Sequence, residues 1–168
     1  MSMHKNIILI HLKDEAAKGV YRPLFERNFI QKLSAILKGL NHKSIRRKYQ
    51  RIFIDLDSKS DIENIKKKLL SLNEINYFCF PEIASSKIEE IKKASLSSLL
   101  ASNAKSFKPK IKISYKAFPF SSKKLTKDIG DYLIKKTDKT LDFIEPETII
   151  YIEILENSSL IYNIIYKS

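Results

Sequence analysis

The sequence has one cysteine, three glycines and no long apolar run. Because Cys79 is alone, an internal disulfide and a cysteine-based zinc site are excluded, and a reducing compartment is favoured. We therefore expect a cytoplasmic protein. So few glycines leave little material for glycine-rich phosphate-binding loops. A membrane helix would need about 18 consecutive apolar residues, and the apolar run from Ile7 to Ile10 is too short for a signal peptide. The sequence thus predicts neither a membrane span nor a secretion signal.

Acidic residues are absent from two long windows of the chain. None occurs between Glu26 and Asp55 or between Glu90 and Asp128, and these windows hold more than half of the 31 Lys and Arg residues. The formal net charge is +12. A polyanion that touched both windows would meet positive potential without local repulsion, so nucleic acid is the first partner to consider. Anionic lipid headgroups would be attracted by the same charge.

The first half of the sequence predicts a compact α/β unit. Apolar residues recur with helical spacing after Arg27, and Asp61 can cap a second helix. Shorter runs rich in β-branched residues predict strands. In chain order we expect a strand at Ile7–Leu12, a helix at Arg27–Leu40, strands at Ser44–Tyr49 and Arg51–Leu56, a helix at Ile62–Leu72 and a strand at Ile75–Phe80. This order is the ferredoxin-like pattern, so a ferredoxin-like domain is predicted at residues 1–82.

The second half has a different pattern and predicts a separate domain at residues 83–168. The expected elements are a helix at Ser86–Ala101, a strand within Phe107–Phe120, a helix from Ser121 or Ser122 to about Lys136, and a hairpin of Thr148–Leu155 with Leu160–Tyr166. The two halves show no internal repeat. The whole chain is therefore predicted to be a two-domain α/β (α+β) protein.

Two features of the second half predict anion binding. Lys108, Lys110 and Lys112 alternate with apolar residues, so one face of the predicted strand is nearly all lysine. The following helix carries Lys123 and Lys124 in its first turn, where an acidic residue would suit the helix dipole better. Free backbone amides and two ammonium groups at one helix start make a suitable anion site.

Two groups of residues resemble domains of tRNA-modifying enzymes. The sequence Phe118-Pro119-Phe120-Ser121-Ser122, with Leu125, Ile129-Gly130 and Glu145-Pro146, resembles a THUMP domain. Lys18-Gly19, Arg22, Phe25 and Phe29 resemble the entry segment of the ferredoxin-like domain that precedes THUMP in the tRNA 4-thiouridine synthetase family, the tRNA sulfurtransferases. Ser114-Tyr115-Lys116 departs from the paired arginines that usually end the corresponding strand in that family. Together the matches span essentially the whole chain in the family's domain order.

The resemblance covers only the RNA-binding half of these synthetases. Family members continue into an ATP-pyrophosphatase domain with a Ser-Gly-Gly-type loop, and some add a rhodanese domain with a sulfur-carrying cysteine. The resemblance therefore implies RNA binding for this chain and catalysis by something else.

The candidate RNA-binding residues are basic side chains and the serines at the predicted helix start. Lysine supplies point charges for phosphates, whereas arginine can bind a phosphate with two hydrogen bonds or stack on an exposed base. The alternative for the whole set is a solvated basic surface without a partner. For Lys18 and Arg22, a further alternative is an ion pair with Glu15 or Glu26. The set comprises Lys18, Arg22, Arg46, Arg47, Lys48, Arg51, Lys108, Lys110, Lys112, Lys116, Ser121, Ser122, Lys123, Lys124 and Lys127.

Candidates for catalysis or metal binding are few. The three histidines have no acidic partners at metal-ligand spacing, and Cys79 lies inside an apolar run that favours a buried thiol. Asp55 and Asp57 fit the end of a strand better than a metal site. We therefore expect no catalytic residue, no metal ligand and no cofactor in this chain.

The basic residues and the resemblance together predict a non-catalytic tRNA-binding protein, and the resemblance implies that it presents the acceptor end of tRNA to a separate modification enzyme. The resemblance favours a free-standing ATP-pyrophosphatase subunit that makes 4-thiouridine. Lone THUMP proteins also resemble adaptors of tRNA cytidine acetyltransferases, which is a first alternative. A basic module that docks on an acidic protein or a membrane is a second, and the RNA-binding part of a longer enzyme is a third. The tRNA hypothesis expects the basic groups of both domains to share one exterior surface.

Overall fold

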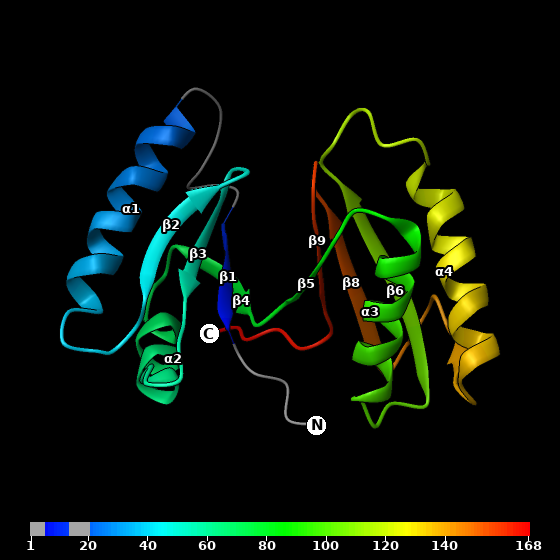
Figure 1. Cartoon of the computed structure of the whole chain (residues 1–168). Coiled ribbons are helices and arrows are strands. Elements are labelled where there is room, and N and C mark those ends of the chain that lie inside the picture. Colours follow the sequence, from blue (N-terminus) through cyan, green and yellow to red (C-terminus); the bar gives the residue numbers. More distant parts are fainter. Residues whose placement is uncertain (1–5, 14–20) are drawn as a thin grey trace. The chain divides into compact units, whose positions relative to one another are not determined.

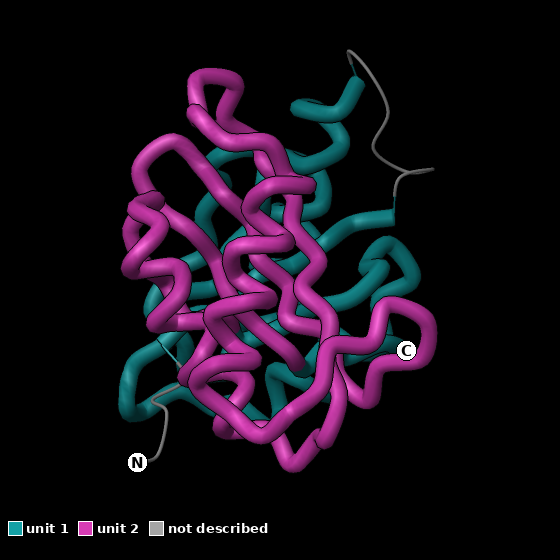
Figure 2. Tube along the Cα trace, turned by 90° about the vertical axis from the view of Figure 1, so that its right-hand side faces the viewer, with its two compact units in different colours: residues 1–80, 164–168 teal, residues 81–163 magenta. Residues whose placement is uncertain are grey.

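The computed structural model describes residues 6–13 and 21–168, and the chain divides into two compact units (Figure 1, Figure 2). Unit 1 is residues 1–80 together with 164–168, and unit 2 is residues 81–163. The sequence had assigned residues 164–168 to the second domain. They belong to unit 1 because Tyr166 exchanges two backbone hydrogen bonds with Phe78, of 2.9 and 3.1 Å, and the two rings stack with centroids 5.1 Å apart.

Unit 1 confirms the predicted ferredoxin-like fold. Its elements are β1 (Ile7–Leu12), α1 (Arg22–Ile36), β2 (Ser44–Lys48), β3 (Arg51–Asp55), α2 (Ile62–Leu70) and β4 (Ile75–Cys79). The strands form an antiparallel sheet in the order β2-β3-β1-β4. This strand order follows from two β-α-β halves whose helices cover the same face of the sheet.

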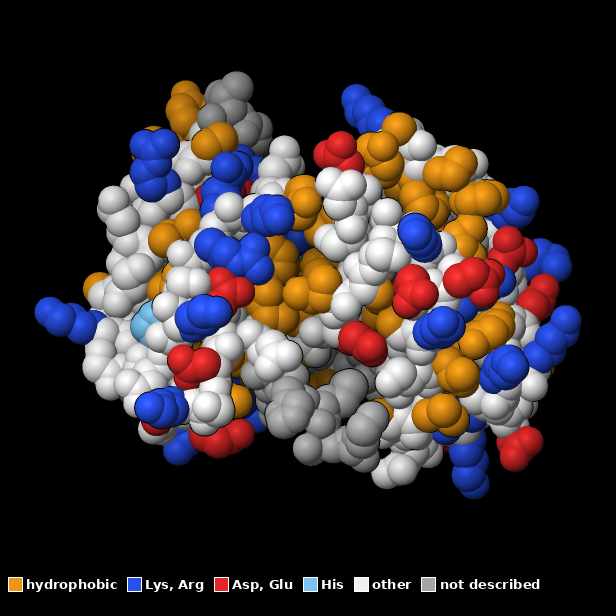
Figure 3. Space-filling model, in the orientation of Figure 1, with side chains coloured by type: hydrophobic (Ala, Val, Ile, Leu, Met, Phe, Trp, Pro, Cys, Tyr) orange, Lys and Arg blue, Asp and Glu red, His pale blue; other side chains and the backbone are white. Residues whose placement is uncertain are grey.

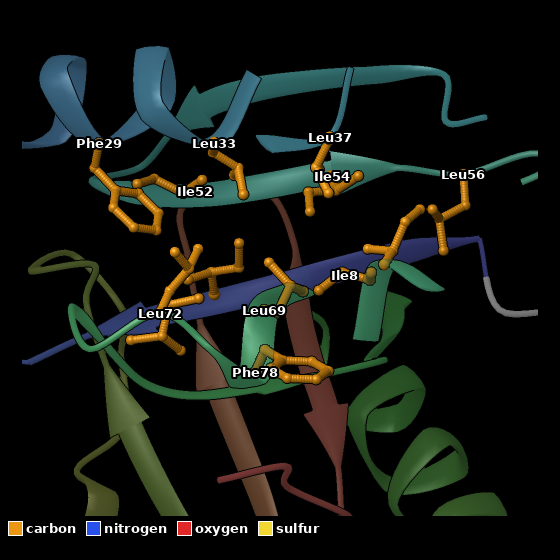
Figure 4. Close-up of a cluster of buried hydrophobic side chains, with 13 residues drawn as sticks. Ile8, Phe29, Leu33, Leu37, Ile52, Ile54, Leu56, Leu69, Leu72 and Phe78 are labelled. Atoms are coloured by element: carbon orange, nitrogen blue, oxygen red, sulfur yellow. The ribbon is translucent and has the colours of Figure 1, made fainter. Parts of the chain in front are cut away.

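The core of unit 1 lies between this sheet and its two helices. Figure 4 shows Phe29 and Leu33 of α1 pointing toward Ile52 and the strands, with Leu69 of α2 in the same cluster. All four are at most 3% exposed. The helical spacing of the α1 residues and the alternation along β3 thus produce one apolar layer.

Helix α1 begins at Arg22, earlier than the predicted start at Arg27. Pro23 lies in its first turn, where the missing amide hydrogen of proline costs no helical hydrogen bond. The only buried residue of the first turns is Glu26, so the apolar pattern gives no signal there. The helix ends at Ile36 instead of Leu40, and Gly39 follows with a φ of 89°, which favours glycine.

Unit 2 is a five-stranded sheet with two helices. Its elements are β5 (Glu82–Ala84), α3 (Ile88–Leu100), β6 (Ser106–Ile113), α4 (Ser122–Lys136), β7 (Thr140–Leu141), β8 (Thr148–Ile154) and β9 (Ser159–Tyr162). The strand order is β5-β9-β8-β6-β7, with β6 parallel to both of its neighbours. The sequence missed β5 and β7, which are edge strands too short to show an alternating pattern. It also extended the last strand to Tyr166, whereas β9 ends at Tyr162.

Both helices of unit 2 pack on the same side of its sheet. Ile91 of α3 and Ile129 of α4 are fully buried against Phe107 of β6 and Ile152 of β8, within one cluster. Because strand side chains alternate between faces, the β6 lysines point to the face opposite the helices. Among the described residues, no helix is long and apolar enough to cross a membrane.

Candidate nucleic-acid interface

The lysines of β6 occupy one strand face as predicted from their spacing. Phe107 and Pro109 are buried, whereas Lys110 and Lys112 are exposed and Lys108 is partly exposed. The alternation therefore separates a core face from a charged face along this strand.

The neighbouring strand β8 makes this lysine face less uniform than the sequence indicates. Tyr151 lies opposite Lys110, whose Nζ is 5.9 Å from the tyrosine ring centroid. Glu153 lies opposite Lys112, is 3% exposed, and its Oε2 accepts a 2.7 Å hydrogen bond from the Tyr162 hydroxyl. Burial raises the pKa of Tyr151. A carboxylate and aromatic rings thus share the face with the lysines.

The start of α4 forms a second basic group in unit 2. Ser121 is the N-cap, and its Oγ accepts a 3.1 Å hydrogen bond from the backbone amide of Lys124. Ser122, Lys123 and Lys124 are exposed. The first turn contains no acidic residue, so its unpaired amides and ammonium groups remain a suitable anion site.

Ring contacts and one ion pair surround this helix start. The Lys124 Nζ lies 5.1 Å from the Phe120 ring centroid, and Phe118 meets Phe120 edge to face at 5.9 Å. Lys127 donates to Asp131 at 3.0 Å, and this hydrogen bond raises the pKa of Lys127. The Asp131 carboxylate therefore offsets the positive charge of Lys127 locally.

A mostly apolar hollow of about 420 Å³ lies beside the segment that joins β6 to α4. Tyr115, Phe118 and Phe120 line one side, and the first turn of α3 lines the other. Phe118 also packs on the unit 2 core. Lys116 is exposed in the same segment.

The basic residues of β2 and β3 are largely paired with carboxylates. The Arg46 Nε donates to Asp55 at 2.7 Å, and the Arg47 guanidinium donates to the fully buried carboxylate of Glu26. Arg51 is only 9% exposed. Figure 3 shows Lys and Arg side chains gathered over the upper end of these strands. Basic side chains are therefore dense on these strands, but Asp55 and Glu26 neutralise the charges of Arg46 and Arg47.

Asp55 illustrates this neutralisation. Burial by itself would raise the pKa of Asp55, but hydrogen bonds from Arg46 and Ser44 outweigh it and hold the pKa below its ordinary value. Arg46 also lies over the Phe53 ring, 4.8 Å from its centroid. The guanidinium thus has a fixed position on the sheet.

Arg22 forms the ion pair that the sequence left open as an alternative. Its Nε donates to Glu26 at 2.7 Å, so Arg22 and Arg47 share one buried carboxylate. Lys18, the other candidate taken from the resemblance, lies outside the described residues.

A further basic group, missed by the sequence analysis, surrounds a hollow of about 680 Å³ at the end of α4. It contains Lys105, Lys135 and Lys136, and the Nζ of Lys139 donates to the backbone carbonyls of Ser102 and Ala104. These lysines are spread over two segments that only the fold brings together, so no local pattern reveals them.

The candidates for catalysis have structural surroundings. Cys79 is buried, His11 stacks on Tyr77 with ring centroids 4.4 Å apart, and the Nδ1 of His42 lies 2.8 Å from the Leu40 carbonyl oxygen. No three His, Cys, Asp or Glu side chains in the described part of the chain are grouped to hold a metal ion. His4 lies outside the described residues.

Comparison with protein families identifies both units. Residues 7–79 match the ThiI ferredoxin-like domain, and residues 85–163 match the THUMP domain. The chain is a THUMP-domain protein. Its lysine-bearing strand and the capped helix α4 both belong to the THUMP domain, whereas the paired arginines belong to the ThiI ferredoxin-like domain.

The THUMP-domain protein is similar to longer proteins. It is 28% identical over 157 residues to the probable tRNA sulfurtransferase of Moorella thermoacetica, covering 93% of this chain and 40% of that protein. It is likewise 28% identical over 161 residues to the probable tRNA sulfurtransferase of Clostridium kluyveri. The chain thus spans about two fifths of the length of these relatives.

Solved structures share the fold of the chain. A protein from Pyrococcus horikoshii superposes with a TM-score of 0.79 at 18% identity, over 97% of this chain and 55% of that one. A 4-thiouridine synthetase in complex with RNA and bound ATP gives 0.74 at 21% identity, over 96% of this chain and 42% of that one. At these identities the similarity shows a common fold.

Proposed function

We propose that this THUMP-domain protein binds tRNA and presents the acceptor end to a separate modification enzyme for 4-thiouridine synthesis. The observation that carries the proposal is the pair of domains, ThiI ferredoxin-like followed by THUMP, over nearly the whole chain. Relatives that match over nearly the whole chain are named probable tRNA sulfurtransferases. In one neighbour of similar fold, a 4-thiouridine synthetase is bound to RNA.

The charges of the THUMP domain support phosphate binding. Lys110, Lys112, Lys123 and Lys124 are exposed, and α4 starts without an acidic residue. Ammonium groups attract phosphates without demanding a base, and helix-start amides can complete the contacts of one phosphate. Such a surface suits the backbone of an acceptor end, while the modified base remains free for the enzyme.

A binding assay with three RNAs at one ionic strength tests the proposal. The ligands are intact tRNA, the same tRNA without its CCA end, and a duplex matched to its acceptor stem. We expect intact tRNA to bind most tightly and trimming to weaken binding. Equal affinity for all three would refute acceptor-end binding, and equal affinity for heparin would point to a general polyanion-binding module.

The identity of the enzyme requires a second assay. An affinity-tagged full chain should recover an ATP-pyrophosphatase subunit from its own cells, and the two together should form 4-thiouridine in tRNA. Each component alone should form none. Recovery of an acetyltransferase would replace the proposed chemistry while leaving tRNA binding intact.

A further inference from the structure

The turn between β2 and β3 has an unusual backbone for its residues. Tyr49 and Gln50 have φ values of 54° and 59°, the only two non-glycine residues of the described chain with positive φ. A two-residue hairpin with both φ values positive is a type I′ turn, which strongly prefers Asn-Gly or Gly-Gly. Tyrosine and glutamine are disfavoured in this conformation. The turn therefore keeps two large side chains at a cost in folding stability.

Guanidinium groups from two elements hold this turn in place. Arg51 donates to the Tyr49 carbonyl at 3.0 Å, and Arg22 of α1 reaches the Gln50 carbonyl at 3.4 Å. Arg22 and Arg47 are themselves fixed on the buried carboxylate of Glu26. Both carbonyls of the strained pair are thus hydrogen-bonded, and the turn is anchored to the helix as well as to its own strands.

The anchored turn presents an aromatic ring beside positive charge. Tyr49 is partly exposed, and the Lys48 Nζ lies 5.0 Å from its ring centroid. Within the described residues, no second ring or cation is paired with Tyr49, and no carboxylate lies within ion-pair distance of Lys48. The ring therefore lies beside a cation and keeps a solvent-exposed part.

We infer that Tyr49 stacks on an unpaired base of the bound RNA while Lys48 meets an adjacent phosphate. This inference rests on the proposed function, to which it adds a base-contacting residue in the ferredoxin-like domain. An aromatic ring next to a cation is the usual means of holding single-stranded RNA without reading its sequence. The sequence neighbours of Tyr49 are Lys48, Gln50 and Arg51, whose polar and basic side chains suit a polyanion.

A tryptophan in place of Tyr49 reports stacking directly. The chain contains no tryptophan, so Tyr49→Trp introduces a single emitter. We expect this variant to bind intact tRNA with wild-type affinity and its emission to be quenched on binding. Leu70→Trp, at a 36% exposed position of α2 in unit 1, is the control and should keep its emission. Unchanged emission of both variants in the bound state would overturn the inference.

Removal of the ring separates stacking from turn strain. Tyr49→Ala should lower tRNA affinity by about tenfold, the loss expected for one stacked base. The slope of log affinity against log salt should stay unchanged, because stacking releases no counterion. Gln50→Gly relieves one strained residue and should raise the melting temperature by a few degrees while tRNA affinity is retained.

The outcomes for the inference and for the proposed function differ. If the wild-type chain does not bind tRNA, the proposed function fails and the inference with it. If the wild-type chain binds tRNA and Tyr49→Ala binds it within twofold, only the inference fails. If Tyr49→Ala also weakens binding to a fully paired duplex equally, the ring does not contact an unpaired base, and the inference is again wrong.

Discussion

At the scale of single residues, the two acidic residues that bound the first acid-free window decide its charge. Glu26 and Asp55 lie at its ends in the sequence. In the folded chain Glu26 forms an ion pair with Arg47 and Asp55 forms one with Arg46, and both arginines lie inside the window. Ion pairing in the folded chain thus reduces the positive potential that the sequence indicates for β2. Lys48, at the turn, is where this strand pair keeps an exposed cation.

Removal of the Glu26 carboxylate should destabilise unit 1. Glu26→Gln keeps the shape but removes the charge that Arg22 and Arg47 share, so we expect a loss of about 2 kcal/mol in the free energy of unfolding. Urea unfolding followed by circular dichroism measures it. Glu63→Gln is the matched control, since the side chain of Glu63 is 75% exposed and its pair should contribute little. Equal stability of both variants would contradict a structural role for the shared carboxylate.

Asp55 gives unit 1 an acid-dependent part of its stability. Its pKa is lower in the folded chain than the ordinary value of about 3.9, so the unfolded chain takes up the proton first as the pH falls. The stabilisation is complete above about pH 5 and is lost as the pH falls through the folded-state pKa.

The Asp55→Asn variant should therefore lose less unfolding free energy between pH 7 and pH 3 than the wild type, as measured by urea unfolding at both pH values. Asp138→Asn removes the same charge at an exposed site of unit 2 and should follow the wild type. A wild-type dependence on pH in Asp55→Asn would show that the Arg46 and Ser44 hydrogen bonds do not matter.

At the scale of elements, the start of α4 shows how one cap defines an anion site. The sequence left Ser121 and Ser122 as alternative caps, and the structure selects Ser121, which accepts from the Lys124 amide. The helix then begins with Ser122, Lys123 and Lys124, whose exposed side chains surround its amino end. A start one residue later would make Lys123 and Lys124 the first and second helical residues instead of the second and third.

Loss of the Ser121 hydroxyl should weaken the helix start. Ser121→Ala should lower the free energy of unfolding by about 1 kcal/mol, the usual cost of an N-cap, whereas Ser122→Ala should be within a few tenths of the wild type. Thermal or urea unfolding distinguishes the two. The reverse order of the two variants would move the cap to Ser122 and shift the lysines by one position.

At the scale of the whole molecule, the two units carry their positive charge differently. The ferredoxin-like unit pairs Arg22, Arg46 and Arg47 with carboxylates, whereas the THUMP unit keeps Lys110, Lys112, Lys123 and Lys124 exposed. We therefore expect most of the salt-dependent affinity for tRNA to come from the THUMP unit. That the basic groups of both units face one RNA stays a prediction.

Substitution of THUMP lysines should change the salt dependence of tRNA binding. Replacing Lys110, Lys112 and Lys124 with alanine should reduce the slope of log affinity against log salt by about 2 to 3, because each phosphate contact contributes about 0.7 to 0.9. Titrations of tRNA at several salt concentrations measure the slope.

The control replaces Lys59, Lys67 and Lys68, which are exposed in unit 1, and changes the net charge by the same amount. If both triple variants lose the same slope, net charge rather than the THUMP surface governs binding.

The sequence by itself determined which segments become helices and strands and which faces of them are apolar. Its periodicity located every strand of unit 1, and the alternation in β6 separated Phe107 from Lys108 and Lys110. Such patterns are local, because a strand or helix repeats its orientation within a few residues. The short edge strands β5 and β7 were not predicted, because they are too short to show a repeating pattern of apolar and polar residues.

Only the tertiary structure decided which charges remain available to a ligand. It brought Glu26 to Arg22 and Arg47, placed Glu153 beside Lys112, and fixed the strained backbone of Tyr49 and Gln50. These are relations between residues distant in the sequence, or between a turn and the helix that anchors it. Electrostatic energy depends on distance in space, so spacing along a chain could not reveal them.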